Sequence, residues 1–179
     1  MGTRVIALLR GINVGGHKKI KMADLRRAAE DLGFARVQSY IQSGNLVFDT
    51  PLPPMSAAWM LETAIEERWG FQVPVIARRR EELVAARAAC PYAGQDEERL
   101  IHLAFLERTP APEAVAALDP DRSPPTRFTV IGAEVHVHYE GGSARSKVTL
   151  GWLEKGLGTR ATGRNLRTVD KLIALAGEG

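Results

Sequence analysis

Apolar residues form two kinds of pattern along the first part of the chain. Some occur in short continuous runs, and others recur every three or four residues. The runs, rich in β-branched and aliphatic residues, occupy 4–10, 35–42, 46–50 and 73–79. Helical spacing marks 22–32 and 56–69, which are followed by Gly33 and Gly70, residues suited to a left-handed helix stop. Residues 1–80 are therefore predicted to fold in the order β-α-β-β-α-β, the split arrangement of ferredoxin-like folds.

The second half repeats this order after a helix predicted over 80–89. Strands are expected at 100–108, 126–131 and 134–139, with a short one at 160–162. Helices are expected at 112–118, 146–157 and 166–176. The predicted fold class is α+β, with two tandem ferredoxin-like repeats, a linker helix and a C-terminal helix. The first unit is placed at 1–80, the linker helix and loop at 81–97, and the second unit with the C-terminal helix at 98–179.

Composition is that of an ordinary globular protein. Of the 179 residues, 45% are hydrophobic and 25% are charged, so a buried core is expected and disorder is excluded. Trp59, Trp69 and Trp152 lie at helical positions and are predicted to be core residues. No apolar stretch approaches the roughly 18 residues that span a bilayer, which predicts a soluble cytoplasmic protein without a membrane partner. The single cysteine, Cys90, excludes an internal disulfide.

Charge is banded along the chain, although the formal net charge is only +3. Residues 1–48 carry eight Lys and Arg against three acidic residues, and residues 142–171 carry seven against two. The stretch 81–140 has five basic residues against eleven acidic ones. If the two basic ends meet in the fold, they form a cleft that attracts an anion; if they lie on different faces, they are solvated surface.

The strongest candidate for a binding site is the segment from Arg10 to Lys21, between the first predicted strand and the first predicted helix. Its glycines permit backbone angles that turn successive N–H groups toward an anion, and the helix N-terminus adds its dipole. The segment is not a P-loop, because no glycine directly precedes its lysines and no hydroxyl follows them. It is either an anion cradle or a flexible basic loop whose glycines permit a tight connection. Its candidate ligand-binding residues are Arg10, Asn13, Gly15, Gly16, His17, Lys18, Lys19 and Lys21.

Two later segments offer further candidates. The turn Ser43-Gly44-Asn45 contains residues that hairpins need for backbone reasons alone, yet Gln42, Ser43 and Asn45 also offer uncharged hydrogen bonds to a ligand. Segment 141–147 has paired glycines and two cations, and Ser146 is predicted to cap a following helix. Glycine plus cation at a helix start thus recurs in both halves. The candidate ligand-binding residues of the second half are Arg145, Ser146, Lys147, Arg164 and Asn165.

The sequence gives little indication of a metal site or of a catalytic triad. His136 and His138 lie two apart and so share a strand face, but no third ligand is placed near them. Such a pair is typical of ordinary half-exposed surface. No G-x-S-x-G elbow occurs, so no catalytic triad is assigned. We expect no metal and no cofactor, and assign no catalytic residue.

Four segments together carry a resemblance to a known family. They read LLRGINVGGHKKIKMADL at 8–25, YIQSGNLVF at 40–48, GGSARSK at 141–147 and TGRN at 162–165. The chain closely resembles the bacterial family known as domain of unknown function 1697, over essentially its whole length. The resemblance implies a fold of two ferredoxin-like repeats and implies no particular activity.

Three functions are consistent with the sequence. The first is a binding module for a phosphate-bearing ligand: a nucleotide, a phosphorylated metabolite or a nucleic acid. RNA binding through sheet aromatics is disfavoured, because the aromatic residues are scattered and the RNP pattern is absent. The second is a small enzyme acting on a phosphorylated substrate, with Arg10 stabilising charge and Asn45 orienting water. The third is a protein-interaction module without a small-molecule ligand. The sequence leaves the oligomeric state open.

Overall fold

The computed structural model describes residues 2–178, which form two compact units. The first unit comprises residues 2–84 together with residues 171–178, and the second comprises Ala85–Asp170. Each unit contains one four-stranded antiparallel sheet with helices, so the predicted α+β class is confirmed.

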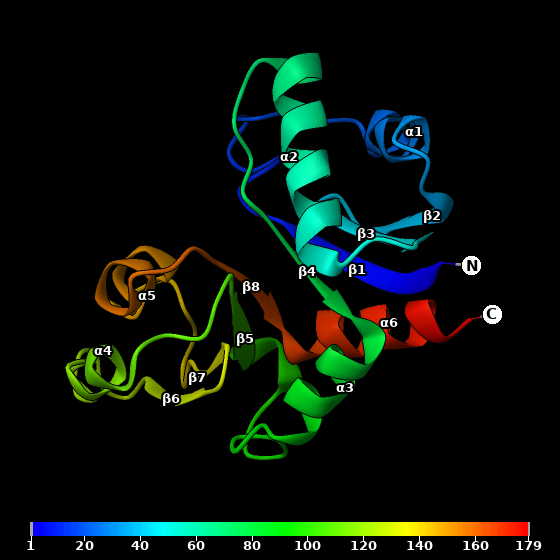
Figure 1. The fold of residues 1–179 in the computed structure, drawn as a ribbon. Helices are drawn as coiled ribbons and strands as arrows, with labels where there is room; N and C mark the ends of the chain where they lie inside the picture. Colours follow the sequence, from blue (N-terminus) through cyan, green and yellow to red (C-terminus); the bar gives the residue numbers. More distant parts are fainter. Residues whose placement is uncertain (1, 179) are drawn as a thin grey trace. The chain divides into compact units, whose positions relative to one another are not determined.

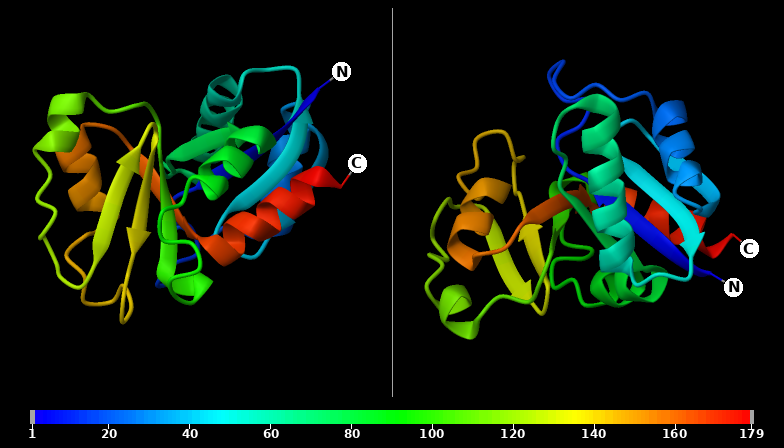
Figure 2. Two further views of the ribbon diagram at one scale, coloured as in Figure 1. Left: turned by 90° about the horizontal axis from the view of Figure 1, so that it is seen from below. Right: turned by 45° about the horizontal axis from the view of Figure 1, so that its top comes forward.

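The first unit follows the order strand, helix, two strands, helix, strand. Its elements are β1 (Thr3–Leu9), α1 (Met22–Asp31), β2 (Ala35–Tyr40), β3 (Asn45–Thr50), α2 (Pro54–Trp69) and β4 (Val75–Arg79). The strands lie in the order β2-β3-β1-β4, and β1 is antiparallel to both of its neighbours. Helices α1 and α2 pack on the same face of this sheet (Figures 1 and 2).

Strand β1 is buried on both faces, which explains why its sequence is a continuous apolar run and not an alternating one. Val5, Ala7 and Leu9 belong to the core cluster that contains the helices, and alternation along the strand directs Ile6 and Leu8 to the opposite face. All five side chains are 0% exposed. Positions 5–9 of the strand therefore do not tolerate a polar side chain without a partner.

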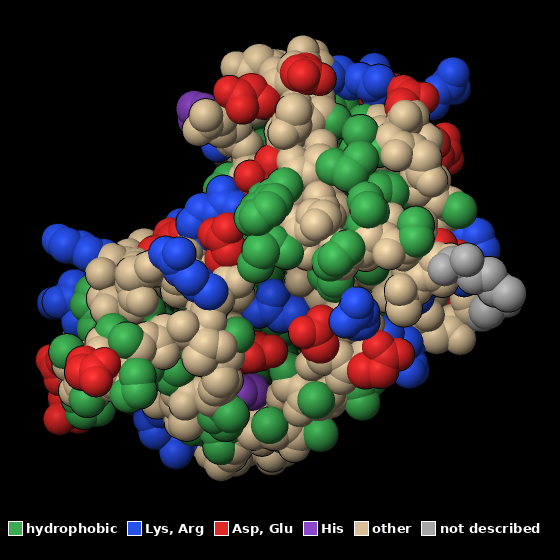
Figure 3. Space-filling model, viewed as in Figure 1, with side chains coloured by type: hydrophobic (Ala, Val, Ile, Leu, Met, Phe, Trp, Pro, Cys, Tyr) green, Lys and Arg blue, Asp and Glu red, His purple; other side chains and the backbone are tan. Residues whose placement is uncertain are grey.

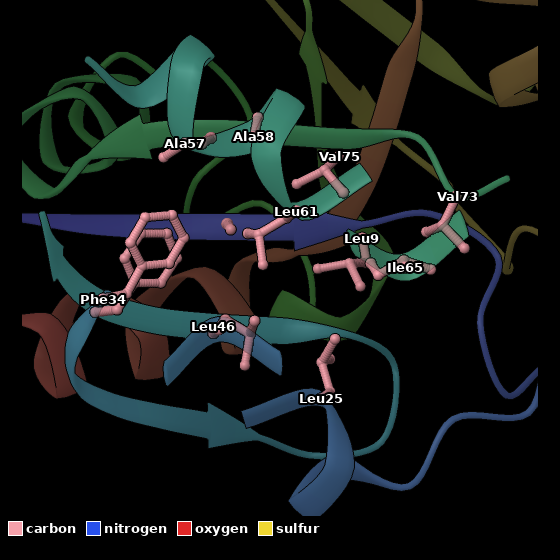
Figure 4. Packing of buried hydrophobic residues seen from close by; sticks show 14 of the residues in the cluster. Leu9, Leu25, Phe34, Leu46, Ala57, Ala58, Leu61, Ile65, Val73 and Val75 are labelled. Atoms are coloured by element: carbon pink, nitrogen blue, oxygen red, sulfur yellow. The ribbon is translucent and has the colours of Figure 1, made fainter. Parts of the chain in front are cut away.

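The core of the first unit lies between the sheet and the two helices (Figure 4). Leu25 of α1 and Leu61 and Ile65 of α2 are fully buried in it. Phe34, which follows α1, stacks on Phe48 of β3 with ring centroids 4.3 Å apart. Aromatic pairs contribute about 0.5–1.5 kcal/mol beyond their buried area, so this stack fixes the connection between α1 and β2 onto the sheet.

The second unit repeats the strand arrangement of the first. Its elements, including two helices that contain residues of both units, are α3 (Arg80–Ala88), β5 (Ile101–Leu106), α4 (Pro112–Ala116), β6 (Arg127–Ile131), β7 (Glu134–His138), α5 (Leu150–Leu157), β8 (Ala161–Asn165) and α6 (Leu166–Gly177). The strands lie in the order β6-β7-β5-β8, and β5 is antiparallel to β7 and β8. Strand β5 thus takes the place that β1 has in the first sheet.

The end of the chain belongs to the first unit. The Nε of Arg80 donates a hydrogen bond to the carbonyl oxygen of Ile173 at 3.0 Å, and Nη1 of Arg36 donates to the carbonyl oxygen of Glu178 at 3.5 Å. The observed units therefore differ from the expected ranges 1–80, 81–97 and 98–179, since the last turns of α6 complete the first unit.

The expected start of the helix at residue 146 is wrong. Helix α5 begins at Leu150, and its N-cap is Thr149, whose Oγ1 accepts a hydrogen bond from the backbone N of Trp152. Ser146 instead accepts a hydrogen bond from the backbone N of Val148 and pairs its hydroxyl with that of Thr126. Both hydroxyl residues suit a cap, and the one nearer the apolar helical positions takes that role.

The prediction that Trp59 is a core residue is also wrong. Trp59 is 53% exposed on α2, and Met55, one turn before it, is 45% exposed. Hydrophobic side chains gather over α2 in the space-filling view (Figure 3). Trp69 and Trp152 are half-buried and pack against the cores of their units.

Gly44 holds the β2–β3 turn against the end of β1. Its φ is +92°, and a Cβ atom there would lie 2.8 Å from the Cβ of Leu9 and 3.0 Å from the Cδ1 of Ile12. Its carbonyl oxygen accepts a hydrogen bond from the backbone N of Leu9 at 2.8 Å. A glycine is therefore required both for the backbone angle and for the close approach.

Replacing the α5 cap tests its role. Thr149→Ala should lower the free energy of unfolding by about 1 kcal/mol, because the N–H of Trp152 loses its acceptor. Thr149→Ser, which keeps the hydroxyl, should retain most of the stability in urea denaturation. Equal losses for the two variants would contradict the capping role.

Gly44→Ala should lower the free energy of unfolding by more than about 2 kcal/mol, since a strained backbone angle is combined with a steric clash against Leu9. The matched control is Gly70→Ala, where φ is +77° but the added Cβ meets nothing within 4 Å. That variant should lose only about 1 kcal/mol. Urea denaturation of both variants measures the difference, and equal losses would show that the contact with Leu9 is unimportant.

Candidate functional site

The segment Arg10–Lys21, which we call the basic loop, contains a miniature hairpin. The backbone N of His17 donates to the carbonyl oxygen of Val14 at 3.0 Å. The two residues between them, Gly15 and Gly16, have φ of +59° and +77°. Positive φ at both central positions defines a type I′ turn, for which a glycine pair is favoured. The paired glycines thus have a local structural use in addition to any role toward a ligand.

Asn13 ties the basic loop to the β2–β3 turn. Its Oδ1 accepts a hydrogen bond from the backbone N of Ile20 at 2.8 Å, and its Nδ2 donates to the carbonyl oxygens of Ile20 at 2.9 Å and Gln42 at 2.8 Å. These bonds use both donors of the amide, so Asn13 organises the site and has no donor left for a ligand. The sequence did not show that the turn and the loop are neighbours, and this one side chain brings them together.

Lys18 anchors the other side of the basic loop. Its Nζ donates to the carbonyl oxygen of Gln72 at 2.6 Å, in the connection between α2 and β4. The backbone N of Arg10 donates to the carbonyl oxygen of Pro74 in the same connection. Lys18 therefore uses one of its three N–H donors to hold the loop and is half-buried, whereas Lys19 and Lys21 are the exposed lysines of the loop.

A pocket of about 620 Å³ opens where the basic loop enters α1. We call it the lysine pocket; its lining residues are Asn13, Gly16, Lys19, Ile20, Lys21, Met22, Asp24, Gln42 and Trp69. Lys21 occupies the N-cap position of α1, and its side chain makes no capping hydrogen bond. The first N–H groups of this ten-residue helix therefore lack a side-chain acceptor beside two ammonium groups. Asp24, in the first turn, is the one carboxylate of the lining.

The remaining candidates of the first unit are not in this lining. His17 is exposed, and its backbone closes the miniature hairpin. Ser43 is exposed at the β2–β3 turn, where its Oγ accepts from Nδ2 of Asn45 at 3.1 Å. Asn45 itself is 0% exposed and also donates to the carbonyl oxygen of Tyr40. The amide of Asn45 is thus enclosed in the hairpin and is not presented to a ligand.

The candidates of the second unit fall into two kinds. Arg145 and Lys147 have exposed side chains, in the connection between β7 and α5. Arg164 is buried, where Nη1 donates to the Oγ1 of Thr162 and to a backbone carbonyl, and burial lowers its pKa to about 10. Asn165 accepts from the backbone N of Thr168 and so caps the start of α6.

The recurrence of glycine and cations does not reflect equivalent positions in the two units. The basic loop joins β1 to α1, whereas residues 141–147 join β7 to α5, which corresponds to the connection between β3 and α2. The two segments therefore occupy different places in the repeated order of elements.

The paired histidines are buried, and the expected half-exposed surface position is wrong. His136 is 1% exposed and His138 is 3% exposed. The guanidinium of Arg127 donates to Nδ1 of His138, whose Nε2 lies 2.9 Å from Oδ2 of Asp96. Since Arg can only donate, Nδ1 accepts and Nε2–H donates to Asp96, which lowers the pKa of that carboxyl. Within residues 2–178, no three His, Cys, Asp or Glu side chains gather to hold a metal ion.

Four lining residues, Ile20, Met22, Asp24 and Trp69, were not among the sequence candidates, and the last two carry polar or aromatic chemistry. Trp69 was expected in the core, and Asp24 was assigned only to the helix dipole. The sequence did give one indication for Trp69. It is the last residue of α2, directly before Gly70, and a side chain at the end of a helix is less completely covered than one in its middle. Asp24 gave no comparable signal, because an acidic residue in the first turn is common in any helix.

The comparisons agree with this architecture of two similar units, each a sheet with helices. The structure is similar to that of a conserved bacterial protein from Streptococcus pneumoniae, with a TM-score of 0.73 and 25% sequence identity over 98% of this chain and 99% of that chain. The family described as protein of unknown function, DUF1697, matches residues 2–136. The chain belongs to this family, as segments 8–25 and 40–48 indicated, whereas segments 141–147 and 162–165 lie outside the matched residues. No curated protein gives a match.

No helix among residues 2–178 has both the length and the apolar character that a bilayer crossing requires.

Buried His136 makes a testable contribution to acid sensitivity. Burial lowers its pKa from the ordinary 6.5 to about 4, and burial also lowers the pKa of His102. The unfolded chain therefore binds a proton between pH 6.5 and 4 that the folded chain does not, so stability falls as pH drops through this window and is unaffected above it. His136→Gln should reduce this pH dependence in thermal unfolding, leaving the part due to His102.

The control for His136 is His17→Gln, which changes an exposed imidazole and should leave the pH dependence due to His136 in place. A His136→Gln profile identical to that of the unmodified protein between pH 6.5 and 4 would contradict the assignment.

Proposed function

We propose that the lysine pocket binds a phosphate-bearing ligand. The observation that carries this proposal is that exposed Lys19 and Lys21 lie beside the uncapped N-terminus of α1 in one pocket. Ammonium groups and N–H groups at a helix start both stabilise an anion, and together they act on the same phosphate. The lining carries two cations and one carboxylate, which leaves it net positive.

The contacts around the pocket support ligand binding by reducing its entropic cost. Asn13 fixes the loop to the β2–β3 turn, and Lys18 fixes it to the connection after α2. A loop held by both sides does not have to be ordered when the ligand arrives, so more of the interaction free energy appears as affinity.

A binding module is favoured over an enzyme by the position of Asn45. The enzymatic hypothesis requires this amide to orient water, but it is fully buried and donates to Tyr40 and Ser43. Asp24 is the one carboxylate of the lining, and no histidine lines the pocket beside it. General acid and base catalysis with two partners has no candidates there.

We also propose that the two units are ferredoxin-like repeats that arose by duplication, in a cytoplasmic protein. Support comes from the same element order and the corresponding strand orders, β2-β3-β1-β4 and β6-β7-β5-β8, in the two sheets.

Inorganic pyrophosphate is a suitable first probe for the lysine pocket. Lys19→Ala and Lys21→Ala should each weaken its binding about tenfold in isothermal titration calorimetry, because a charge-assisted contact is removed. Raising the salt concentration should weaken binding to the unmodified protein as well. Lys171→Ala is the control, since this exposed lysine of the first unit lies outside the pocket. If all three variants bind pyrophosphate equally, or if none of the proteins binds it, the proposed function is wrong.

A further inference from the structure

The lysine pocket is larger and chemically more varied than a phosphate group requires. Its volume of about 620 Å³ lies well within the range of roughly 300–1,000 Å³ that is typical of small-molecule sites. A phosphate held by Lys19 and Lys21 fills only part of this space. The rest of the lining combines an indole, an amide and a carboxylate, contributed by Trp69, Gln42 and Asp24.

Trp69 offers a flat apolar surface in the pocket. It is the last residue of α2, it is half-buried, and it packs against the core of the first unit, which restricts its movement. The guanidinium of Arg68 lies over the indole ring, 5.8 Å from its centre, and forms an ion pair with Asp31 at 2.8 Å; it does not line the pocket. A planar ligand group in the pocket therefore meets the part of the indole that Arg68 and the core leave uncovered, and contact with this flat apolar surface favours stacking.

Asp24 limits what the ligand can be. A carboxylate in the pocket repels a phosphate that comes close to it, so a purely anionic ligand gains no favourable contact at Asp24. A neutral part of the ligand that carries hydroxyl or N–H donors can donate hydrogen bonds to Asp24, because a carboxylate accepts several of them. Gln42 adds a side chain that both donates and accepts.

We infer that the lysine pocket takes a nucleoside mono- or diphosphate, an inference that rests on the proposed phosphate site. The phosphates lie at Lys19 and Lys21, the base stacks on Trp69, and donors of the ribose or base reach Asp24. One indole and two available ammonium groups match one nucleotide. A nucleic-acid strand needs a longer track of cations, and the third lysine of the loop, Lys18, does not line the pocket.

The test compares ADP, GDP, CDP and UDP with inorganic pyrophosphate in isothermal titration calorimetry on the full chain. At least one nucleotide should bind more than about fivefold more tightly than pyrophosphate, the lower end of what base stacking contributes. Trp69→Leu should weaken nucleotide binding much more than pyrophosphate binding and so remove this advantage, while Trp69→Phe should keep part of it. Trp59→Leu, on the exposed side of α2 and outside the pocket, is the matched control and should change neither affinity.

Asp24→Asn gives a second readout with opposite signs for the two kinds of ligand. Removing the carboxylate should strengthen pyrophosphate binding, because repulsion is lost, and should weaken binding of the preferred nucleotide, because a strong acceptor is lost. A variant that merely perturbs folding should not strengthen binding of one ligand while weakening binding of the other. Thermal unfolding of each variant shows whether it is folded.

The outcomes separate the two proposals. If pyrophosphate binds through Lys19 and Lys21 but no nucleotide binds more tightly, the nucleotide inference is wrong and the phosphate proposal stands. If the nucleotide advantage survives Trp69→Leu, stacking on this indole is wrong. If neither pyrophosphate nor any nucleotide binds, both proposals are wrong.

Discussion

Burial of the central strands on both faces is the constraint on which each unit depends. Strand β1 pairs with a neighbour on each edge, and its side chains from Val5 to Leu9 are all 0% exposed. A polar group at such a position loses water without gaining a partner, so chemistry is confined to the ends of the strand. The first charged residue after this run is Arg10, and the basic loop begins there. The candidate site thus starts at the residue where complete burial stops.

The order of helices and strands was predictable because each element carries its own periodicity. The runs at 4–10 and 46–50 and the helical spacing at 22–32 differ in ways that local sequence records directly. The helix boundary near Ser146 was not predictable in the same way. Ser146 and Thr149 are both good caps, and the choice between them depends on which hydroxyl finds another partner, here Thr126, through tertiary structure. Exposure of Trp59 has the same origin, since helical spacing does not reveal which face the sheet covers.

The sequence indicated where the candidate site lies, but not which of its residues line the pocket and which hold the loop in place. Glycines and lysines between a strand and a helix indicated an anion site, yet the same residues serve a type I′ turn at Gly15 and Gly16. Sequence shows that Asn13 and Lys18 are polar, but not that they bond to Gln42 and Gln72, which are distant along the chain. Residues that bind ligand and residues that hold the loop look alike until their partners are known.

The return of the chain end to the first unit affects how the protein emerges from the ribosome. Residues up to Val84 are complete early, but Lys171 and the residues after it belong to the same unit and are translated last. At about 5–20 residues per second, several seconds separate these two parts during synthesis. The second unit, in contrast, is one uninterrupted stretch of chain from Ala85 to Asp170. The unit whose synthesis begins first is therefore the one that waits longest for its final segment.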